Sequence, residues 1–111
     1  MDSIELITNE LITFRDKRNW EQFHNAKDLA LALSIEAAEL NELFLWKKAD
    51  EADVEKIKEE LADVFNYAFM LAQKYNLSVQ AICLKKITKN AEKYPVEKSR
   101  NSSAKYTELM D

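Results

Sequence analysis

The sequence contains no glycine and a single proline, Pro95, in 111 residues. Tight two-residue hairpin turns and phosphate-binding loops need glycine at fixed positions, so neither kind of structure is expected. Hydrophobic residues make up 47% of the chain, which rules out a disordered chain and is enough for one modest core. We therefore predict an all-α fold.

Apolar residues recur every three or four positions along four segments, as they do on the core-facing side of a helix. We predict helices over residues 3–17, 26–48, 51–75 and 79–93, with N-caps at Asp2, Asn25, Asp50 and Ser78. Pro95 prevents the last helix from continuing. The predicted four-helix domain therefore covers residues 1–95, and residues 96–111 form a tail.

Residues 18–26, here called the aromatic loop, have no helical period but carry Trp20, Phe23 and His24. Two interpretations fit this loop. The aromatic side chains could fill the end of the helix bundle, or they could form a wall that stacks on a planar ligand.

Two acidic pairs lie in the second and third predicted helices: Glu36 with Glu39, and Glu60 with Asp63. Residues three apart on a helix point the same way, so each pair presents two carboxylates together. Glu36 and Glu60 also fall within the apolar stripes, where an unpaired carboxylate costs several kcal/mol. Four acids on two facing helices therefore predict a shared cation, although such pairs are also common on exposed helices.

Carboxylate oxygens select hard cations, so Mg²⁺ is the expected metal and Mn²⁺ a possible substitute. One histidine and one cysteine are too few for the usual zinc sites. A cation held in this way can orient a water molecule and neutralise a phosphoryl group. The residues alone thus favour a metal-assisted hydrolase that acts on a nucleotide phosphate.

Charge is unevenly distributed along the chain. The net charge is −4, with −7 in residues 1–83 and +3 in residues 84–111. Overall acidity argues against general nucleic-acid binding, whereas an acidic centre beside a basic end suits a metal-bound polyphosphate. Lys86, Asn90 and Lys93 share one face of the predicted fourth helix, here called the basic stripe, and the alternative interpretation of this stripe is a solvated surface.

Compartment and membrane signals are few. The lone Cys83 indicates a reducing, cytoplasmic environment, and no signal peptide is expected. The longest apolar run, residues 64–72, falls far short of the ~20 residues that span a bilayer, so no membrane association is expected. Residues 61–72 are apolar on nearly all sides, which predicts cover from a partner subunit.

Several segments of the sequence resemble those of a known protein family. Glu36-Ala37-Ala38-Glu39-Leu40 and Glu59-Glu60-Leu61-Ala62-Asp63-Val64 are similar to the MazG-like, all-α nucleoside triphosphate pyrophosphohydrolases. Three further segments resemble the dCTP pyrophosphatase branch: Trp20-Glu21-Gln22-Phe23-His24, Asn90 with Lys93-Tyr94-Pro95, and Ser102 to Leu109. The similarity covers about residues 10–110.

The resemblance implies a four-helix domain that assembles as a homodimer or homotetramer. It also implies Mg²⁺-dependent hydrolysis of a deoxynucleoside triphosphate, most of all dCTP or a modified dCTP, to the monophosphate and pyrophosphate in house-cleaning of the nucleotide pool. The metal-binding and catalytic residues it implies are Glu36, Glu39, Glu60 and Asp63. The substrate-binding residues it implies are Trp20, His24, Trp46 and Tyr67 near base and sugar, Asn90, Lys86 and Tyr94 near the nucleotide and its phosphates, and Lys105 and Tyr106 in a tail that wraps the site.

Two other hypotheses stay open. The chain could be a non-enzymatic helical interaction module that binds a partner through the apolar half of its third helix. It could also be an enzyme of the same fold that acts on dUTP or a phosphoribosyl nucleotide.

Overall fold

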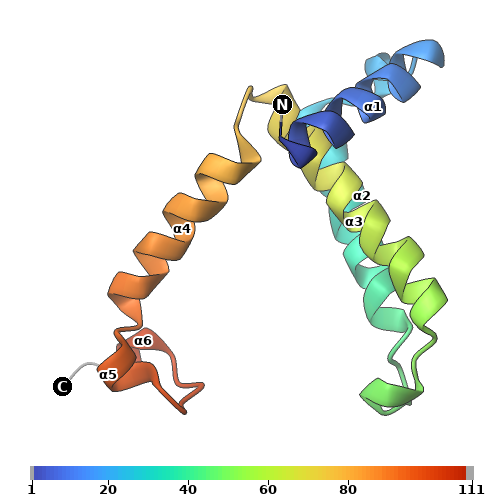
Figure 1. Ribbon diagram of the computed structural model, residues 1–111. Helices are drawn as coiled ribbons and strands as arrows, with labels where there is room; N and C mark the ends of the chain where they lie inside the picture. Colours follow the sequence, from blue (N-terminus) through green and yellow to red (C-terminus); the bar gives the residue numbers. More distant parts are fainter. Residues whose placement is uncertain (1, 110–111) are drawn as a thin grey trace. The chain divides into compact units, whose positions relative to one another are not determined.

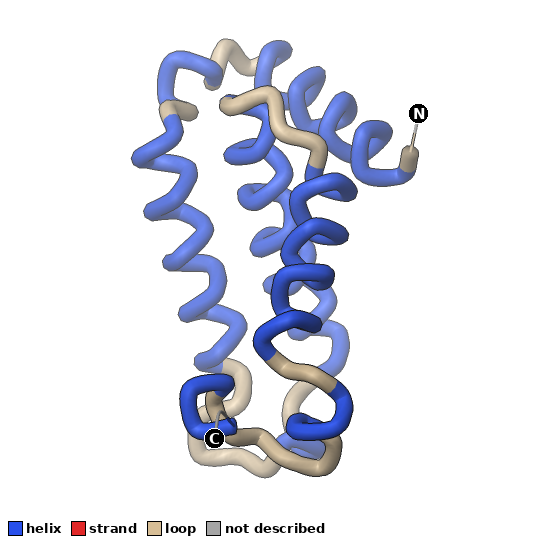
Figure 2. Tube along the Cα trace, turned by 90° about the vertical axis from the view of Figure 1, so that its left-hand side faces the viewer, coloured by secondary structure: helices blue, strands red, loops and turns tan. Residues whose placement is uncertain are grey.

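The structure is a computed structural model that describes residues 2–109. Within this range it contains helices and loops and no strand, which confirms the all-α prediction (Figures 1 and 2). The long helices are α1 (Ser3–Lys17), α2 (Ala26–Glu42), α3 (Val54–Lys74) and α4 (Val79–Lys93); the short ones are η1 (Glu21–Phe23), η2 (Ala49–Glu51), α5 (Val96–Ser99) and α6 (Tyr106–Leu109). The chain divides into two compact units, one up to Leu77 and one from Ser78 onward.

The first unit is built on the pairing of α2 with α3, which run side by side, and α1 packs against α3 (Figure 1). Its core is small and lies along this pairing. Leu29 of α2 is 1% exposed, and Met70 and Ala72 of α3 are also buried. The connection between the two helices is held at Ala52, which is buried as well. The apolar stripes that predicted these helices therefore do face each other.

Three of the four predicted N-caps are confirmed. Each cap side chain accepts a backbone N–H from the first turn: Asp2 Oδ1 from Glu5 (2.7 Å), Asn25 Oδ1 from Asp28 (2.9 Å) and Ser78 Oγ from Ala81 (3.2 Å). The fourth is wrong, because Asp50 lies inside η2. The cap of α3 is Asp53, whose Oδ1 accepts the N–H of Glu55 at 3.0 Å.

The predicted boundaries between the second and third helices are also wrong. α2 ends at Glu42 and not near Lys48, and α3 begins at Val54 and not at Glu51. After Glu42, three successive N–H groups bond to the carbonyl three residues earlier, which tightens the chain into turns. Trp46 then takes a φ of 62°, a left-handed value that a continuing helix does not allow.

Two helices of the first unit end in the same way without glycine. Asn19 and Asn76 have φ values of 52° and 54°, the left-handed region that asparagine tolerates better than most residues. The next N–H then reaches back to the carbonyl five residues earlier: Trp20 to Arg15, and Leu77 to Ala72, both at 3.0 Å. This Schellman pattern closes each helix and fixes the direction of the chain that follows.

The second unit contains α4 and the segment that was predicted as a tail. α4 has the predicted bounds, and α5 begins directly after Pro95. The tail is not irregular throughout, because α5 and α6 form within it; residues 110–111 lie outside the described residues. Whether residues 1–95 and 96–111 act as domain and tail stays a prediction. Across residues 2–109, no helix has both the length and the apolar character needed to cross a membrane.

Candidate functional site

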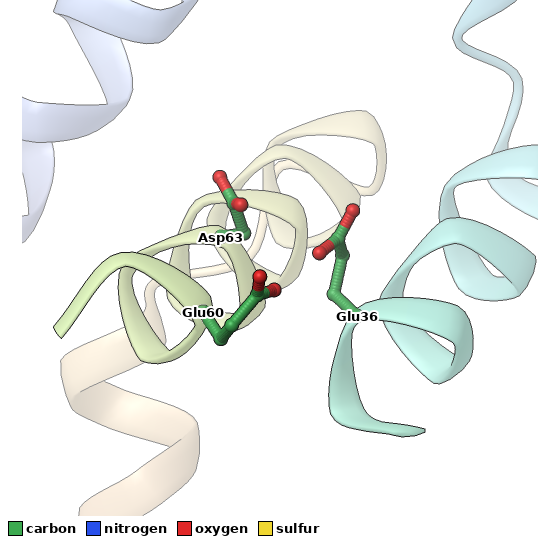
Figure 3. A group of neighbouring side chains, drawn as sticks. All are labelled: Glu36, Glu60 and Asp63. Atoms are coloured by element: carbon green, nitrogen blue, oxygen red, sulfur yellow. The ribbon is translucent and has the colours of Figure 1, made fainter. Parts of the chain in front are cut away.

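Three carboxylates meet between the two paired helices of the first unit. Glu36 comes from α2, and Glu60 and Asp63 come from α3. One oxygen of each lies within 4.8 Å of the others, an arrangement that could hold a metal ion. Figure 3 shows the side chains of Glu36 and Glu60 extending toward each other from the two helices, with Asp63 beside them. We refer to these three residues as the acidic cluster.

The burial of these side chains is unusual for acids. Glu36 and Glu60 are half-buried, as their places in the apolar stripes predicted, and Asp63 is exposed. The Oε2 atoms of Glu36 and Glu60 are buried and have no hydrogen-bond partner within the described part of the chain. Buried carboxylate oxygens need a partner. A hard divalent cation would satisfy both oxygens, so the residues present fit such a group.

The electrostatics point the same way. Burial, the neighbouring Glu39 and the charges of Asp63 and Glu60 together raise the pKa of Glu36 to about 7. Burial and Glu39 also raise the pKa of Glu60. The pKa values rise because ionising each acid places another negative charge in a partly desolvated group of negative charges. A divalent cation would reverse this effect by favouring the ionised carboxylates.

Glu39 and Tyr67 lie at the edge of the acidic cluster. Glu39 is half-buried on α2 and acts on the pKa of both Glu36 and Glu60. The pKa of the Tyr67 phenol is raised by burial and then by the charges of Glu36, Asp63 and Glu39. The structure thus gathers five of the predicted residues in one place, three of them close enough to share an ion. Their roles stay a prediction.

The pH dependence of stability should expose this arrangement. The pKa of Glu36 is about 7 in the folded protein and 4.5 in an ordinary carboxyl group, so the folded state binds the extra proton between these values. We expect the melting temperature of the metal-free protein to fall as the pH rises through this window, because the unfolded state loses its proton first. Thermal melts followed by circular dichroism, in chelator, measure this.

Magnesium should reverse the effect, and more strongly at high pH. Mg²⁺ bound to the ionised cluster would stabilise the folded protein, so the rise in melting temperature on adding Mg²⁺ should be larger at about pH 8 than at about pH 5.5. Glu36→Gln removes the titrating group and should flatten the metal-free profile. A Mg²⁺-induced shift that is equal at both pH values, or is absent, would contradict the assignment of a cation to this cluster.

The aromatic loop carries two of the predicted substrate residues. Trp20 is 43% exposed, and its ring meets Phe14 edge-on with centroids 5.8 Å apart. The Arg18 guanidinium stacks on Phe14 at 3.6 Å from the ring centroid. His24 is half-buried, and burial lowers its pKa first, followed by the charges of Arg15 and Lys74. Trp20 therefore keeps part of its ring free for a ligand while α1 supports the rest.

Trp46 is placed differently from its prediction. The residue falls within the predicted second helix, residues 26–48, but it lies beyond the end of α2 and is 99% exposed. A large aromatic ring in a left-handed residue with no cover is not serving the core of this unit. A role in substrate binding stays a prediction for this residue.

The remaining predicted residues belong to the second unit. Lys86 and Asn90 are exposed on α4, as both interpretations of the basic stripe require. Tyr94 and Tyr106 meet edge-on with ring centroids 6.1 Å apart. Lys105, which precedes α6, is exposed.

Two positive side chains have surroundings that the sequence did not predict. Lys93 sits over the Tyr106 ring, with Nζ 5.0 Å from its centroid, so it helps to hold α6. Arg15 is only 5% exposed, although it carries a full charge. The signal for Arg15 was present, because it lies four residues after Leu11 on the apolar stripe of α1.

The chain is similar to known proteins in sequence. The model of the MazG-like family matches residues 31–109. dCTP pyrophosphatase 1 of Mus musculus is 38% identical over 104 residues, which cover 86% of this chain and 61% of that protein. The same protein of Homo sapiens is 39% identical with the same coverage. This chain therefore spans about three fifths of the length of these curated relatives.

A solved structure is similar along almost its whole length. The crystal structure of a pyrophosphatase from Archaeoglobus fulgidus DSM 4304 superposes with a TM-score of 0.79 at 34% sequence identity. The match covers 86% of this chain and 94% of that one.

Proposed function

Because this chain belongs to the MazG-like family, we propose that it is a Mg²⁺-dependent nucleotide pyrophosphohydrolase. Its substrate is a deoxynucleoside triphosphate, dCTP or a modified dCTP before others, and its products are the monophosphate and pyrophosphate. The names of the similar proteins, dCTP pyrophosphatase and pyrophosphatase, support this choice. House-cleaning of the nucleotide pool in the cytoplasm is part of the same proposal.

The observation that carries the proposal is the acidic cluster with its unpartnered, buried oxygens. Glu36, Glu60 and Asp63, with Glu39 beside them, would hold Mg²⁺. Bound there, Mg²⁺ supplies positive charge that neutralises phosphoryl oxygens and makes a nearby water more acidic. The pKa of Glu36, raised to about 7, supports this choice, because nearby positive charge would favour the ionised carboxylates.

The rest of the reaction falls to the side chains of the chain itself. Water attacks the α-phosphorus, and the bond from that phosphorus to the oxygen bridging the α- and β-phosphates breaks. A carboxylate of the cluster accepts a proton from the water, and pyrophosphate leaves. Trp20, His24, Trp46 and Tyr67 would hold the base and sugar, while Lys86, Asn90, Tyr94, Lys105 and Tyr106 would contact the nucleotide and its phosphates.

We propose further that the protein works as a homodimer or homotetramer. Taken by itself, the first unit leaves large apolar side chains exposed on both paired helices: Leu31, Ile35, Leu61 and Phe65. Taken by itself, α4 also exposes three large apolar side chains: Ile82, Leu84 and Ile87. Apolar surface of this extent favours association. Sedimentation equilibrium decides the point, and a monomer at micromolar concentration would contradict it.

A pyrophosphate-release assay tests the proposed function. The substrates are the four dNTPs, the four NTPs, dUTP and 5-methyl-dCTP, each with Mg²⁺ and with a chelator. We expect fast, Mg²⁺-dependent turnover that is fastest for the cytosine deoxynucleotides. Turnover of all bases at similar rates would keep the chemistry and overturn the preference for dCTP. Failure to turn over any nucleotide would overturn the function.

A further inference from the structure

The aromatic loop is joined to the rest of the first unit by a carboxylate placed between two cations. Glu21 Oε2 lies 3.8 Å from Arg15 Nη2, and Glu21 Oε1 lies 3.7 Å from Lys74 Nζ. Arg15 belongs to α1, Glu21 to η1 within the loop, and Lys74 is the last residue of α3. One side chain thus connects three segments that are distant in the sequence.

Arg15 and Lys74 are both shielded from water, so their contacts with Glu21 stabilise charges that water cannot solvate fully. The Arg15 side chain is 6% exposed and that of Lys74 is 23% exposed. A cation so far removed from water needs negative partners close by. Asp16 supplies one for Arg15, with its Oδ1 at 3.0 Å from both Nε and Nη2. Glu21 is the second carboxylate near Arg15 and the one that also reaches Lys74.

Backbone hydrogen bonds also fix Trp20 and His24, the proposed substrate residues on either side of Glu21. The N–H of Trp20 donates to the carbonyl of Arg15 at 3.0 Å. The N–H of His24 donates to the carbonyl of Glu21, also at 3.0 Å. Trp20 is therefore tied to Arg15 by its own backbone and through the side chain of the next residue.

The same two cations act on His24. Burial lowers the pKa of its imidazole, and the charges of Arg15 and Lys74 lower it further. The lowered pKa favours the neutral imidazole, in which one ring nitrogen donates a hydrogen bond and the other accepts one. Its Nδ1 is buried and has no hydrogen-bond partner among residues 2–109. The two ring nitrogens of His24 can point in one fixed direction only if the aromatic loop is itself held in place.

We propose that Glu21 is a positioning residue, which holds Arg15 and Lys74 together and so sets where Trp20 and His24 meet the nucleobase. This inference rests on the proposed function. Glu21 itself does not touch the substrate in this proposal. Its loss should therefore loosen the loop and weaken substrate binding while the acidic cluster continues to work.

Fluorescence tests the positioning without any turnover. The chain has two tryptophans, so in a Trp46→Phe background the emission comes from Trp20 alone. In that background, Glu21→Gln should raise the constant for quenching by acrylamide toward that of free tryptophan. Glu55→Gln is the matched control, because Glu55 also pairs with a lysine, Lys58, at 2.9 Å, but on the exposed face of α3. Equal quenching in both variants would overturn the proposal.

Steady-state kinetics test the consequence in the otherwise unchanged protein. Glu21→Gln should raise KM for dCTP about tenfold and leave kcat within about twofold, the signature of lost uniform binding. Lys74→Gln should also raise KM. The double variant should raise KM little further than Glu21→Gln alone, because both changes remove the same ion pair between Glu21 and Lys74. A fall in kcat at unchanged KM, or fully additive effects, would overturn the proposal.

The two hypotheses fail in different ways. If the wild-type protein turns over no nucleotide, the proposed function is wrong, and the quenching comparison alone then decides whether Glu21 fixes the loop. If the wild type is active but Glu21→Gln matches it in KM and quenching, the function stands and the positioning role is wrong.

Discussion

Glu60→Gln should abolish pyrophosphate release and, in the same protein, raise the melting temperature of the metal-free form. The amide keeps the size of the side chain but cannot supply a charged oxygen to Mg²⁺. We expect kcat to fall on the order of 100-fold or more, the scale seen when one group that stabilises transition-state charge is removed. The metal-free protein becomes more stable because a partly buried acid no longer faces Glu36 and Asp63.

The opposite signs of the two effects make this prediction sharp. Rates at saturating Mg²⁺ and thermal melts in chelator measure them on one preparation. Glu59→Gln is the matched control, since Glu59 is the preceding residue of α3 and is exposed. It should leave both quantities unchanged. Activity lost in both variants alike, or a Glu60→Gln protein that is active and less stable, would remove Glu60 from the site.

The other acids should show the same loss of activity. Glu39→Gln and Asp63→Asn are each expected to reduce turnover to a trace, since both belong to the predicted set of ligands. Rates near wild type in both variants would refute the assignment of the site to these acids.

Trp20→Ala should raise KM for dCTP about 10- to 100-fold with kcat largely retained, because stacking of a base on an aromatic side chain contributes roughly 1–3 kcal/mol. Trp20 keeps 43% of its surface exposed and is supported from one side by Phe14. Its ring is thus available without further movement of the core. Initial rates over a range of dCTP concentrations give both constants.

Phe23→Ala is the control for Trp20. Phe23 lies in the same loop, at the end of η1, and is 61% exposed, but it is not among the predicted substrate residues. It should leave KM close to the wild-type value. If the two alanine variants raise KM equally, the loop contributes general apolar surface and Trp20 has no special place in it.

The parts of the fold that follow from local chemistry were predictable. α1 and α4 have the predicted bounds because capping side chains mark their starts, and Pro95 forbids continuation beyond α4. The end of α2 was not predictable in this way. Leu43 to Leu45 continue the apolar period, and neither glycine nor proline marks the stop. The helix ends where the chain tightens into turns over Leu43 to Leu45, ahead of the left-handed backbone of Trp46.

The candidate site also contains a part that was predictable from the sequence and a part that was not. The acidic cluster was predictable from spacing, since Glu36 and Glu60 fall within the apolar stripes along which α2 and α3 pack, and Asp63 lies three residues after Glu60. The bridge of Arg15, Glu21 and Lys74 depends on how the aromatic loop folds back over two helices. Contacts of that kind join distant residues, and helical periodicity carries no information about them. Asn19 has a left-handed backbone and redirects the chain after α1. In this chain without glycine, asparagine occupies such a position at a helix end.

The acidic cluster occupies a single helical hairpin, with both carboxylate-bearing helices joined by one short connection. The residues proposed to hold the base lie partly before this hairpin, and the basic segment follows it after Leu77. Under the proposed function, a change in either flanking segment would alter contacts with the nucleotide and leave the carboxylates of the hairpin in place.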